Sequence, residues 1–225
     1  EWILVWCCCC LAACQQVGFI VLKKSNLLEN HFDLFFLEDR NAVKSVWANG
    51  IVPYEISPNL GRQAEIQEAF RMISGFTCIR FIPHTDELHY ISIKDASVIN
   101  CLKCPCQPVY FAQSCTTGNL AHELIHALGL YHEHTRNDRD EYISINWSSV
   151  IPSKKRNFKV KNGDTLNQPY DYDSIMHYGP SFFSADGNPT IVTHKKAQKI
   201  GQRIRLSPLD IKKLNILYKW SDYFY

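Results

Sequence analysis

The stretch that decides the fold is His122-Glu123-Leu124-Ile125-His126-Ala127-Leu128-Gly129-Leu130-Tyr131-His132-Glu133. His122 and His126 are four residues apart, so on a helix their side chains project from the same face. Gly129 can leave right-handed helical dihedrals at low cost, which allows a sharp turn that brings His132 back toward the first two imidazoles. Three neutral imidazoles leave an open position for water on zinc, as catalytic zinc sites do. The spacing therefore predicts a helix, a turn and a catalytic zinc site.

Glu123 lies beside the first histidine, where it can act on a water at the metal without being a ligand itself. A chance match to this spacing, with the glycine and the third histidine included, has a probability of roughly 1 in 30,000 in a chain of this composition. The alternative is that the histidines are ordinary residues of an amphipathic helix. That alternative explains the apolar residues between them but not the histidine spacing.

The composition is that of a soluble globular protein. The chain has 225 residues, of which 46% are hydrophobic and 20% are charged. One domain of ordinary core size fits this length, with a short extension before it. The formal net charge of +2 is too small to indicate nucleic acid or an anionic membrane as a partner. We expect a monomer without stable membrane association.

Residues 1–22 are apolar and contain a run of cysteines that is followed by small residues. This pattern is typical of the hydrophobic region of a signal peptide and is too short to span a bilayer comfortably. A palmitoylated or membrane-spanning anchor is the competing interpretation. Secretion is the prediction that we carry forward, and it would remove the five N-terminal cysteines with the signal peptide.

The body of the chain contains Cys78, Cys101, Cys104, Cys106 and Cys115. In a cytosolic protein this spacing would suggest metal or redox chemistry, whereas disulfides are the better interpretation for a secreted chain. Their connectivity does not follow from the sequence. The odd number leaves at least one thiol unpaired or in an intermolecular bond.

Local patterns predict an α+β fold with a helix packed over a sheet. Residues 50–56, 78–82 and 89–93 resemble strands, and Pro53 favours an edge or a strand end for the first of them. Residues 62–74 have a helical period that Gly75 ends. A C-terminal helix is predicted from Ser207, with a proline at its first position and Asp210 three residues after the cap.

Between these elements the sequence offers further candidate sites. The charged run of residues 134–141 is typical of a solvated loop, and Asn146-Trp147-Ser148 is a glycosylation sequon if the chain is secreted. Met176 alone would be assigned to core packing. Tyr178 could place a phenol near the metal.

The motif of residues 122–133 resembles the zinc signature of the metzincins, and residues 174–178 resemble their Met-turn. Glu133 directly after the third histidine, together with Tyr178 two residues after Met176, is similar to the astacin family of zinc metalloendopeptidases. The resemblance covers about residues 41–220 and is nearest to the hatching-enzyme branch. It implies a mixed sheet with helices, arranged in two subdomains with the active-site cleft between them.

The resemblance also implies a set of roles. His122, His126, His132 and Tyr178 would be ligands of one zinc ion, together with a water. Glu123 would be the general base, and Tyr178 would move off the metal to hydrogen-bond the oxyanion. Met176 would form the apolar floor below the imidazoles. The substrate would be a protein or peptide, with egg-envelope protein as the inferred target of a hatching-type enzyme.

In the domain organisation that follows, residues 1–22 are a signal peptide, 23–40 a short propeptide and 41–225 the peptidase domain. Cleavage after Arg40 would expose Asn41, whose amine would reach Glu133. Asp39 would be the acidic residue that occupies the open zinc position of the zymogen.

The cysteines differ from the family pattern. The resemblance implies a Cys101–Cys115 disulfide, but the loop between them is shortened and contains the additional Cys104 and Cys106. Cys78 lacks its family partner because Trp220 stands at that position. We therefore keep an alternative function, a catalytically impaired secreted protein that binds a matrix protein. The intact ligands and base favour an active secreted zinc endopeptidase.

Overall fold

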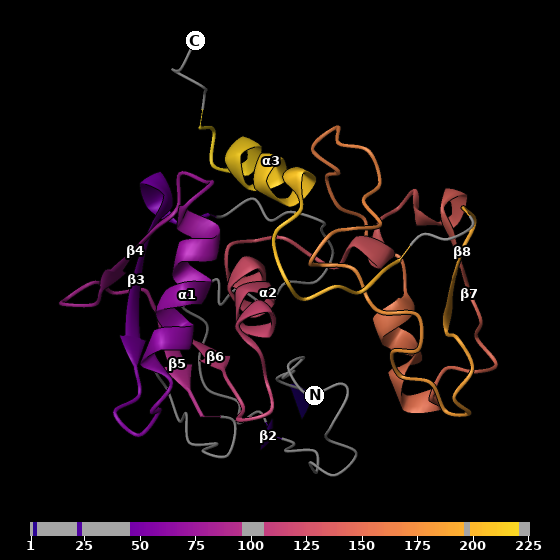
Figure 1. Cartoon of the computed structure of the whole chain (residues 1–225), viewed down its shortest axis with the longest axis horizontal. Helices are drawn as coiled ribbons and strands as arrows, with labels where there is room; N and C mark the ends of the chain where they lie inside the picture. The colour runs from indigo at the N-terminus through magenta and orange to yellow at the C-terminus, as the bar shows by residue number, and fades with distance from the viewer. Residues whose placement is uncertain (1, 4–21, 24–45, 96–105, 196–198, 221–225) are drawn as a thin grey trace.

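A four-stranded sheet occupies the first half of the molecule in the computed structural model (Figure 1), which describes residues 2–3, 22–23, 46–95, 106–195 and 199–220. The sheet has the order β4-β3-β5-β6 and all of its pairings are parallel. Its strands are β3 Ile51–Ile56, β4 Arg80–Pro83, β5 Tyr90–Lys94 and β6 Cys106–Tyr110.

Two helices pack against each other beside this sheet, α1 (Gln63–Ser74) and α2 (Thr117–Ala127). The apolar stripe of α1 is fully buried in a core that it shares with strands β3 and β5 and with α2. This arrangement confirms the predicted helix and the first three strands. The prediction of a helix over a sheet is therefore correct for this half of the chain.

The predicted edge position of Pro53 is wrong, because β3 has a neighbour on each side. Proline is compatible with this inner strand because the two ladders are staggered. Pro53 is paired with Ile82 of β4, whereas the ladder with β5 begins only at Tyr54. The missing N–H of Pro53 therefore falls before the stretch of β3 that is paired on both sides.

The second half of the molecule has little regular structure and its own core. Its elements are η3 Glu133–Thr135, η4 Arg139–Glu141, β7 Ile143–Ile145, η5 Pro152–Phe158 and β8 Ile191–Thr193. Strands β7 and β8 pair antiparallel. The aromatic rings of Phe158, Tyr170, Tyr172 and Tyr178 are the main part of this second core. Two separate cores agree with the expected two subdomains.

The mixture of parallel and antiparallel pairing is thus divided between separate sheets. The remaining short elements are β1 Trp2–Ile3, β2 Leu22–Lys23 and η2 Ala48–Gly50, with β1 and β2 antiparallel. Helix α1 connects the parallel strands β3 and β4, so helices and sheets are mixed within this fold. None of the described helices combines the length and the apolar character needed to cross a membrane.

Helix α3 (Pro208–Leu217) closes the described chain and lies at the top of Figure 1. Its N-terminus has the predicted capping box, in which Ser207 accepts from the Asp210 backbone and Asp210 accepts from the Ser207 backbone. Leu214 belongs to the first core, so the helix returns to the half that contains α1 and α2. This return places α3 above the histidine motif.

Candidate metal centre

Helix α2 carries the first two histidines on a rigid support. It begins at a capping box in which Thr116 Oγ1 accepts from Asn119 N at 3.3 Å and Asn119 Oδ1 accepts from Thr116 N at 2.9 Å. The apolar side chains between the histidines, including Leu124 and Ile125, are completely buried in the first core. Packing of that face therefore fixes the opposite face, from which the imidazoles project.

Gly129 makes the turn that the sequence predicts. Its φ of 106° lies in the left-handed region, which is strained for other residues. Helix α2 ends two residues earlier, at Ala127, with Leu128 as its C-cap. After the turn, the Leu130 carbonyl accepts a hydrogen bond of 2.8 Å from Nδ1 of His126, and His132 returns to the helix.

The three imidazoles converge through their Nε2 atoms. His132 Nε2 lies 3.2 Å from Nε2 of His122 and 3.0 Å from Nε2 of His126. Among the described residues, these three histidines form the one group of His, Cys, Asp and Glu side chains gathered closely enough to hold a metal ion. A tetrahedral zinc with Zn–N bonds of about 2.0–2.1 Å separates its nitrogens by about 3.4 Å. The observed separations are close to that value.

The other ring nitrogens determine which tautomer each imidazole adopts. His122 Nδ1 donates to the Ile175 carbonyl at 2.8 Å, and His126 Nδ1 donates to the Leu130 carbonyl at the same distance. Their Nε2 atoms then carry lone pairs that face the same point, and lone pairs this close repel each other unless a cation lies among them. The donor set therefore fits a zinc ion.

Burial keeps these rings neutral. Loss of hydration lowers the pKa of His126 to about 4, and the same cause holds the pKa of His122 and of His132 well below the ordinary value. Neighbouring positive charges, among them Arg203, lower these pKa values further. Neutral imidazole is the form that binds metal, so no proton has to leave at neutral pH.

Glu123 projects from the same helix, one residue after the first histidine, and its side chain is half-buried. Tyr178 approaches from the other core and is 2% exposed. Its ring meets the ring of His132 edge to face, with centroids 4.5 Å apart, and stacks on His134 at 3.9 Å. The structure thus brings the ring of Tyr178 next to the ring of the third histidine.

His134 is a neighbour of the site that sequence reasoning missed. It is completely buried between the metal centre and the second core, and its Nε2 bonds the Asn157 carbonyl at 3.0 Å. Burial holds its pKa well below the ordinary value. No local pattern marks this residue, because its role comes from the stacking on Tyr178, 44 residues later in the chain.

Met176 is buried in the first core, and its carbonyl accepts a 3.1 Å bond from the Glu133 backbone. This bond joins the segment after the third histidine to the segment of residues 174–178. The packing prediction for Met176 is therefore correct.

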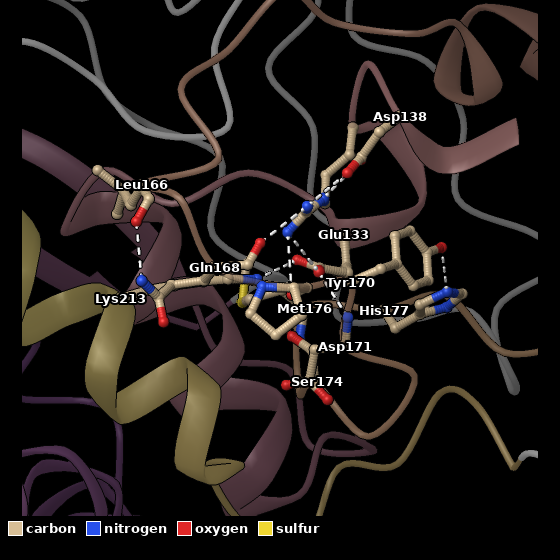
Figure 2. A network of polar contacts seen from close by, with 12 residues as sticks. Glu133, Asp138, Leu166, Gln168, Tyr170, Asp171, Ser174, Met176, His177 and Lys213 are labelled. Carbon is tan, nitrogen blue, oxygen red and sulfur yellow. Dashed lines mark hydrogen bonds and ion pairs between the residues drawn. The ribbon is translucent and has the colours of Figure 1, made fainter. Parts of the chain in front are cut away.

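Glu133 is the centre of a buried polar network (Figure 2) and is 4% exposed. Its Oε1 accepts from Asp171 N at 2.9 Å and from Arg136 Nη1 at 3.2 Å, and its Oε2 accepts from Lys213 Nζ at 2.6 Å. The expected contact with Asn41 lies outside the described residues. Lys213 was missed because it is 80 residues away and looks like any helix lysine in the sequence.

The interpretation of residues 134–141 as a solvated loop is wrong for its two arginines, although Asn137, Asp140 and Glu141 are exposed. Arg136 and Arg139 are 2% and 4% exposed. Arg136 makes two bonds to Asp138, at 2.9 and 2.7 Å, and further bonds to Glu133 and to the backbone of residues 168 and 169. Every donor of its planar guanidinium is thereby used, which is the arrangement in which arginine can be buried.

The remaining predicted residues lie away from this centre or outside the described part. Asp39, Cys101 and Cys104 fall outside the described residues. Cys78 has a free, half-buried thiol, whose pKa burial raises, and Trp220 is exposed on the surface. Cys115 is buried in the first core.

Asn146 lies immediately after β7 and is half-buried. Its side-chain nitrogen donates to Ser149 Oγ at 2.9 Å and to the Pro189 carbonyl at 3.3 Å. The sequon nitrogen is thus engaged in the folded protein.

Comparison with known proteins agrees with this geometry. A family model described as Astacin (Peptidase family M12A) matches residues 39–219. High choriolytic enzyme 1 of Oryzias latipes is 41% identical over 207 residues, which cover 83% of this chain and 76% of that protein. Low choriolytic enzyme of the same fish is 36% identical, over 91% of this chain and 84% of that protein. Zinc metalloproteinase nas-14 of Caenorhabditis elegans is 37% identical, but the chain spans only 38% of its length.

Solved structures give the same result. High choriolytic enzyme 1, a hatching enzyme zinc-protease from Oryzias latipes, superimposes with a TM-score of 0.70 at 39% identity, covering 78% of this chain and 93% of that one. Myroilysin, at 16% identity and a TM-score of 0.53, shares the fold alone. The family match, the relatives and the histidine cluster agree, and the chain therefore belongs to the astacin family of zinc metalloendopeptidases.

Proposed function

We propose that this chain is a secreted endopeptidase in which His122, His126 and His132 hold the zinc ion and Glu123 is the general base. The observation that carries the proposal is the convergence of three Nε2 atoms within a few ångströms of one another. Two of these imidazoles also donate from Nδ1 to backbone carbonyls, the outer-shell contact that orients zinc-binding histidines. Bound zinc supplies a Lewis acid that polarises the scissile carbonyl and activates water near neutral pH.

Glu123 is the proton carrier of the proposed reaction. It removes a proton from the attacking water as the water oxygen bonds to the carbonyl carbon. The C–N bond then breaks, and Glu123 delivers the same proton to the leaving amine. Its place one residue after a ligand on α2 supports this role, since the helix holds the carboxylate beside the metal centre without making it a ligand.

Tyr178 is proposed as a further ligand and as the donor to the oxyanion that forms on the substrate. The contact of its ring with His132, and its nearly complete burial, support this assignment. Glu133 and Met176 are proposed as structural residues next to the site. They connect the segment after His132 to residues 174–178 through the bond from the Glu133 N–H to the Met176 carbonyl.

We propose the domain organisation of the sequence analysis for the remainder of the chain. Residues 1–22 are removed as a signal peptide, residues 23–40 are a propeptide with Asp39 as its inhibitory ligand, and 41–225 is the peptidase. The family match from residue 39 supports a domain start at this point. A Cys101–Cys115 disulfide and a glycan on Asn146 belong to the same proposal for a secreted protein.

The substrate class that we propose is protein of the egg envelope. Identities of 36% and 41% to two choriolytic enzymes support it. Isolated fish egg envelopes incubated with the active enzyme should lose protein to the supernatant. Envelopes that stay intact while casein is cleaved would remove this substrate class and leave the endopeptidase.

Casein cleavage by the full chain tests the proposed activity. The protein is secreted from eukaryotic cells and assayed before and after mild trypsin treatment that is stopped with a trypsin inhibitor. The assays contain 1,10-phenanthroline or, as the matched control, a non-chelating isomer. We expect cleavage that the chelator abolishes and the isomer does not. Cleavage that persists in the chelator would contradict the proposal. Absence of cleavage despite one bound zinc would favour the catalytically impaired alternative.

Sequencing of the new N-terminus tests the activation site. Trypsin cuts after arginine, so activation should coincide with a new N-terminus at Asn41. Activity that appears with a different N-terminus would contradict the propeptide boundary.

A protein that stays with the cell membranes would contradict secretion and favour the lipid or membrane anchor.

A further inference from the structure

Helix α3 contacts the surroundings of the metal centre at two points, although it is far from the histidine motif in sequence. Both contacts come from charged side chains that are almost completely buried. Lys213 is 6% exposed and Asp210 is 1% exposed. They are three positions apart, so they lie on the same face of the helix.

The first contact is the ion pair of Lys213 with Glu133 (Figure 2). Lys213 Nζ lies 2.6 Å from Glu133 Oε2. Glu133 directly follows the ligand candidate His132, and its N–H donates to the Met176 carbonyl at 3.1 Å. Lys213 therefore fixes the position of Glu133, and with it the course of the backbone directly after His132.

The second contact is made by Asp210. Its Oδ1 accepts from Ser174 Oγ at 2.6 Å, and its Oδ2 accepts from the Ile175 N–H at 2.9 Å. The carbonyl of the same Ile175 accepts the 2.8 Å bond from His122 Nδ1. Asp210 thus holds the residue that orients the first histidine.

We propose that Lys213 and Asp210 are positioning residues of the metal centre, through which α3 sets the distance between His132 and His122. The proposal rests on the proposed function, in which these histidines hold zinc. A metal site needs its ligands within about 0.5 Å of the binding geometry. Helix α3 supplies that constraint, because it binds a residue next to each of the two ligands through Lys213 and Asp210. These two side chains belong to one helix and cannot shift independently.

Lys213→Met in the full chain tests the first contact, and Lys212→Met is its matched control. Lys212 is the exposed neighbour on the same helix. The zinc dissociation constant is measured by competition with a coloured chelator, and the visible spectrum is recorded with cobalt in place of zinc. Near-ultraviolet circular dichroism confirms that each variant is folded. We expect Lys213→Met to weaken zinc binding about 10- to 100-fold, to shift the cobalt bands and to lower kcat more than it raises KM.

Lys212→Met should match the wild type in all of these measurements. A folded Lys213→Met protein with wild-type zinc affinity and an unchanged cobalt spectrum would overturn the proposal. If Lys213→Met does not fold, Ser174→Ala decides the question. It removes the hydrogen bond from Ser174 Oγ to Asp210 and the one from the Met176 N–H to Ser174 Oγ, without burying an unpaired charge. The expected loss of zinc affinity is then about tenfold. Unchanged affinity in that variant would overturn the proposal as well.

Asp210→Asn tests the second contact against Asp173→Asn. Asp173 is a half-exposed carboxylate that pairs with Arg205 at 2.7 Å on the surface. Asn keeps the size of Asp210, and its oxygen can still accept from the Ile175 and Ser207 N–H groups, but its amide N–H replaces the acceptor that faces Ser174 Oγ. Zinc affinity should therefore fall in this variant and not in the control. Failure of the wild type to bind zinc would instead contradict the proposed function. A wild type that binds zinc, with no change in either positioning variant, would contradict this inference alone.

Discussion

At the scale of single residues, Glu123 carries the sharpest prediction. Glu123→Gln keeps the size of the side chain and removes its ability to take a proton. Turnover of casein should therefore fall by a factor of about 10² to 10⁴, with the zinc content unchanged because Glu123 is not among the residues gathered to hold a metal ion. Glu68→Gln, which alters an exposed glutamate on α1 that pairs with Arg71, is the control. Turnover within twofold of the wild type would refute the general-base role.

Tyr178→Phe separates the phenol from the ring. The ring contacts with His132 and His134 should survive, while the donor to the oxyanion is lost. We expect kcat to fall about 10² to 10³-fold with little change in KM. Tyr172→Phe is the control, because its hydroxyl donates to the Tyr142 carbonyl in the same aromatic core. Equal kcat values for the two variants would contradict the role of Tyr178.

The sequence predicts those site residues whose relation is local. His122 and His126 are visible because a helix brings positions four apart together. Lys213, Arg136 and His134 are not visible, because their burial depends on contacts with distant segments. A charged run on a helix or in a loop is usually solvated, and only the folded chain shows that Arg136 fills a site with backbone carbonyls around it.

At the scale of elements, the turn after α2 is the part on which the site depends. Gly129→Ala places a Cβ at a φ of 106°. The free energy of unfolding of the metal-free protein should fall by about 1–2 kcal/mol, since the left-handed conformation costs this much for other residues. The displaced turn should also weaken zinc binding through His132. Urea unfolding and chelator competition measure the two effects.

Gly61→Ala is the matched control for this change. A Cβ at Gly61 meets no atom within 4 Å, and its φ is not in the left-handed region. Its unfolding free energy should stay within about 0.5 kcal/mol of the wild type. Equal unfolding free energies for the two alanine variants would contradict the account of the turn.

Most elements follow from local patterns, and the exceptions have physical causes. The capping residues of α3 predict its start correctly. Helix α2 begins earlier than its histidines indicate. Its capping box is hard to recognise in the sequence, because Asn119 stands in place of the usual glutamate or glutamine. Strand β6 lies in the cysteine-rich segment, whose residues indicated disulfides and hid the strand. The edge position predicted from Pro53 was wrong, because the stagger of the two ladders depends on strand register. The sequence of a single strand does not reveal that register.

At the scale of the whole molecule, buried neutral histidines make stability depend on pH. Burial lowers the pKa of five histidines, His122, His126, His132, His134 and His177. The unfolded chain gains protons at these positions as the pH falls through about 6.5, and the folded chain does not. The contribution of these histidines to the free energy of unfolding is therefore fully present above about pH 6.5. As the pH decreases below this value, the free energy of unfolding decreases by up to about 1.4 kcal/mol per pH unit for each histidine.

Asp210 acts in the opposite direction, since burial raises its pKa to about 6. It is one group against five, so the metal-free protein should need less urea to unfold at about pH 5 than at about pH 7.5. Equal urea midpoints at the two pH values would show that these histidines are not held neutral in the folded state.

The architecture at this scale agrees with the family resemblance. An α+β fold with two cores was expected, and the chain matches a hatching enzyme structure over 78% of its length. The link between the cores was not expected, because it runs through the buried ion pair of Glu133 and Lys213. Sequence patterns describe which face of an element is apolar, but they do not describe which charges meet between elements.

Titration of zinc into the metal-free chain, after trypsin activation and removal of the trypsin on an inhibitor column, tests the central claim most directly. Casein cleavage should be absent at the start, rise in proportion to added zinc and stop rising at one zinc per chain. His126→Ala should fail to recover under the same conditions. Cleavage by the metal-free protein, or full recovery by His126→Ala, would contradict a zinc endopeptidase built on these three histidines.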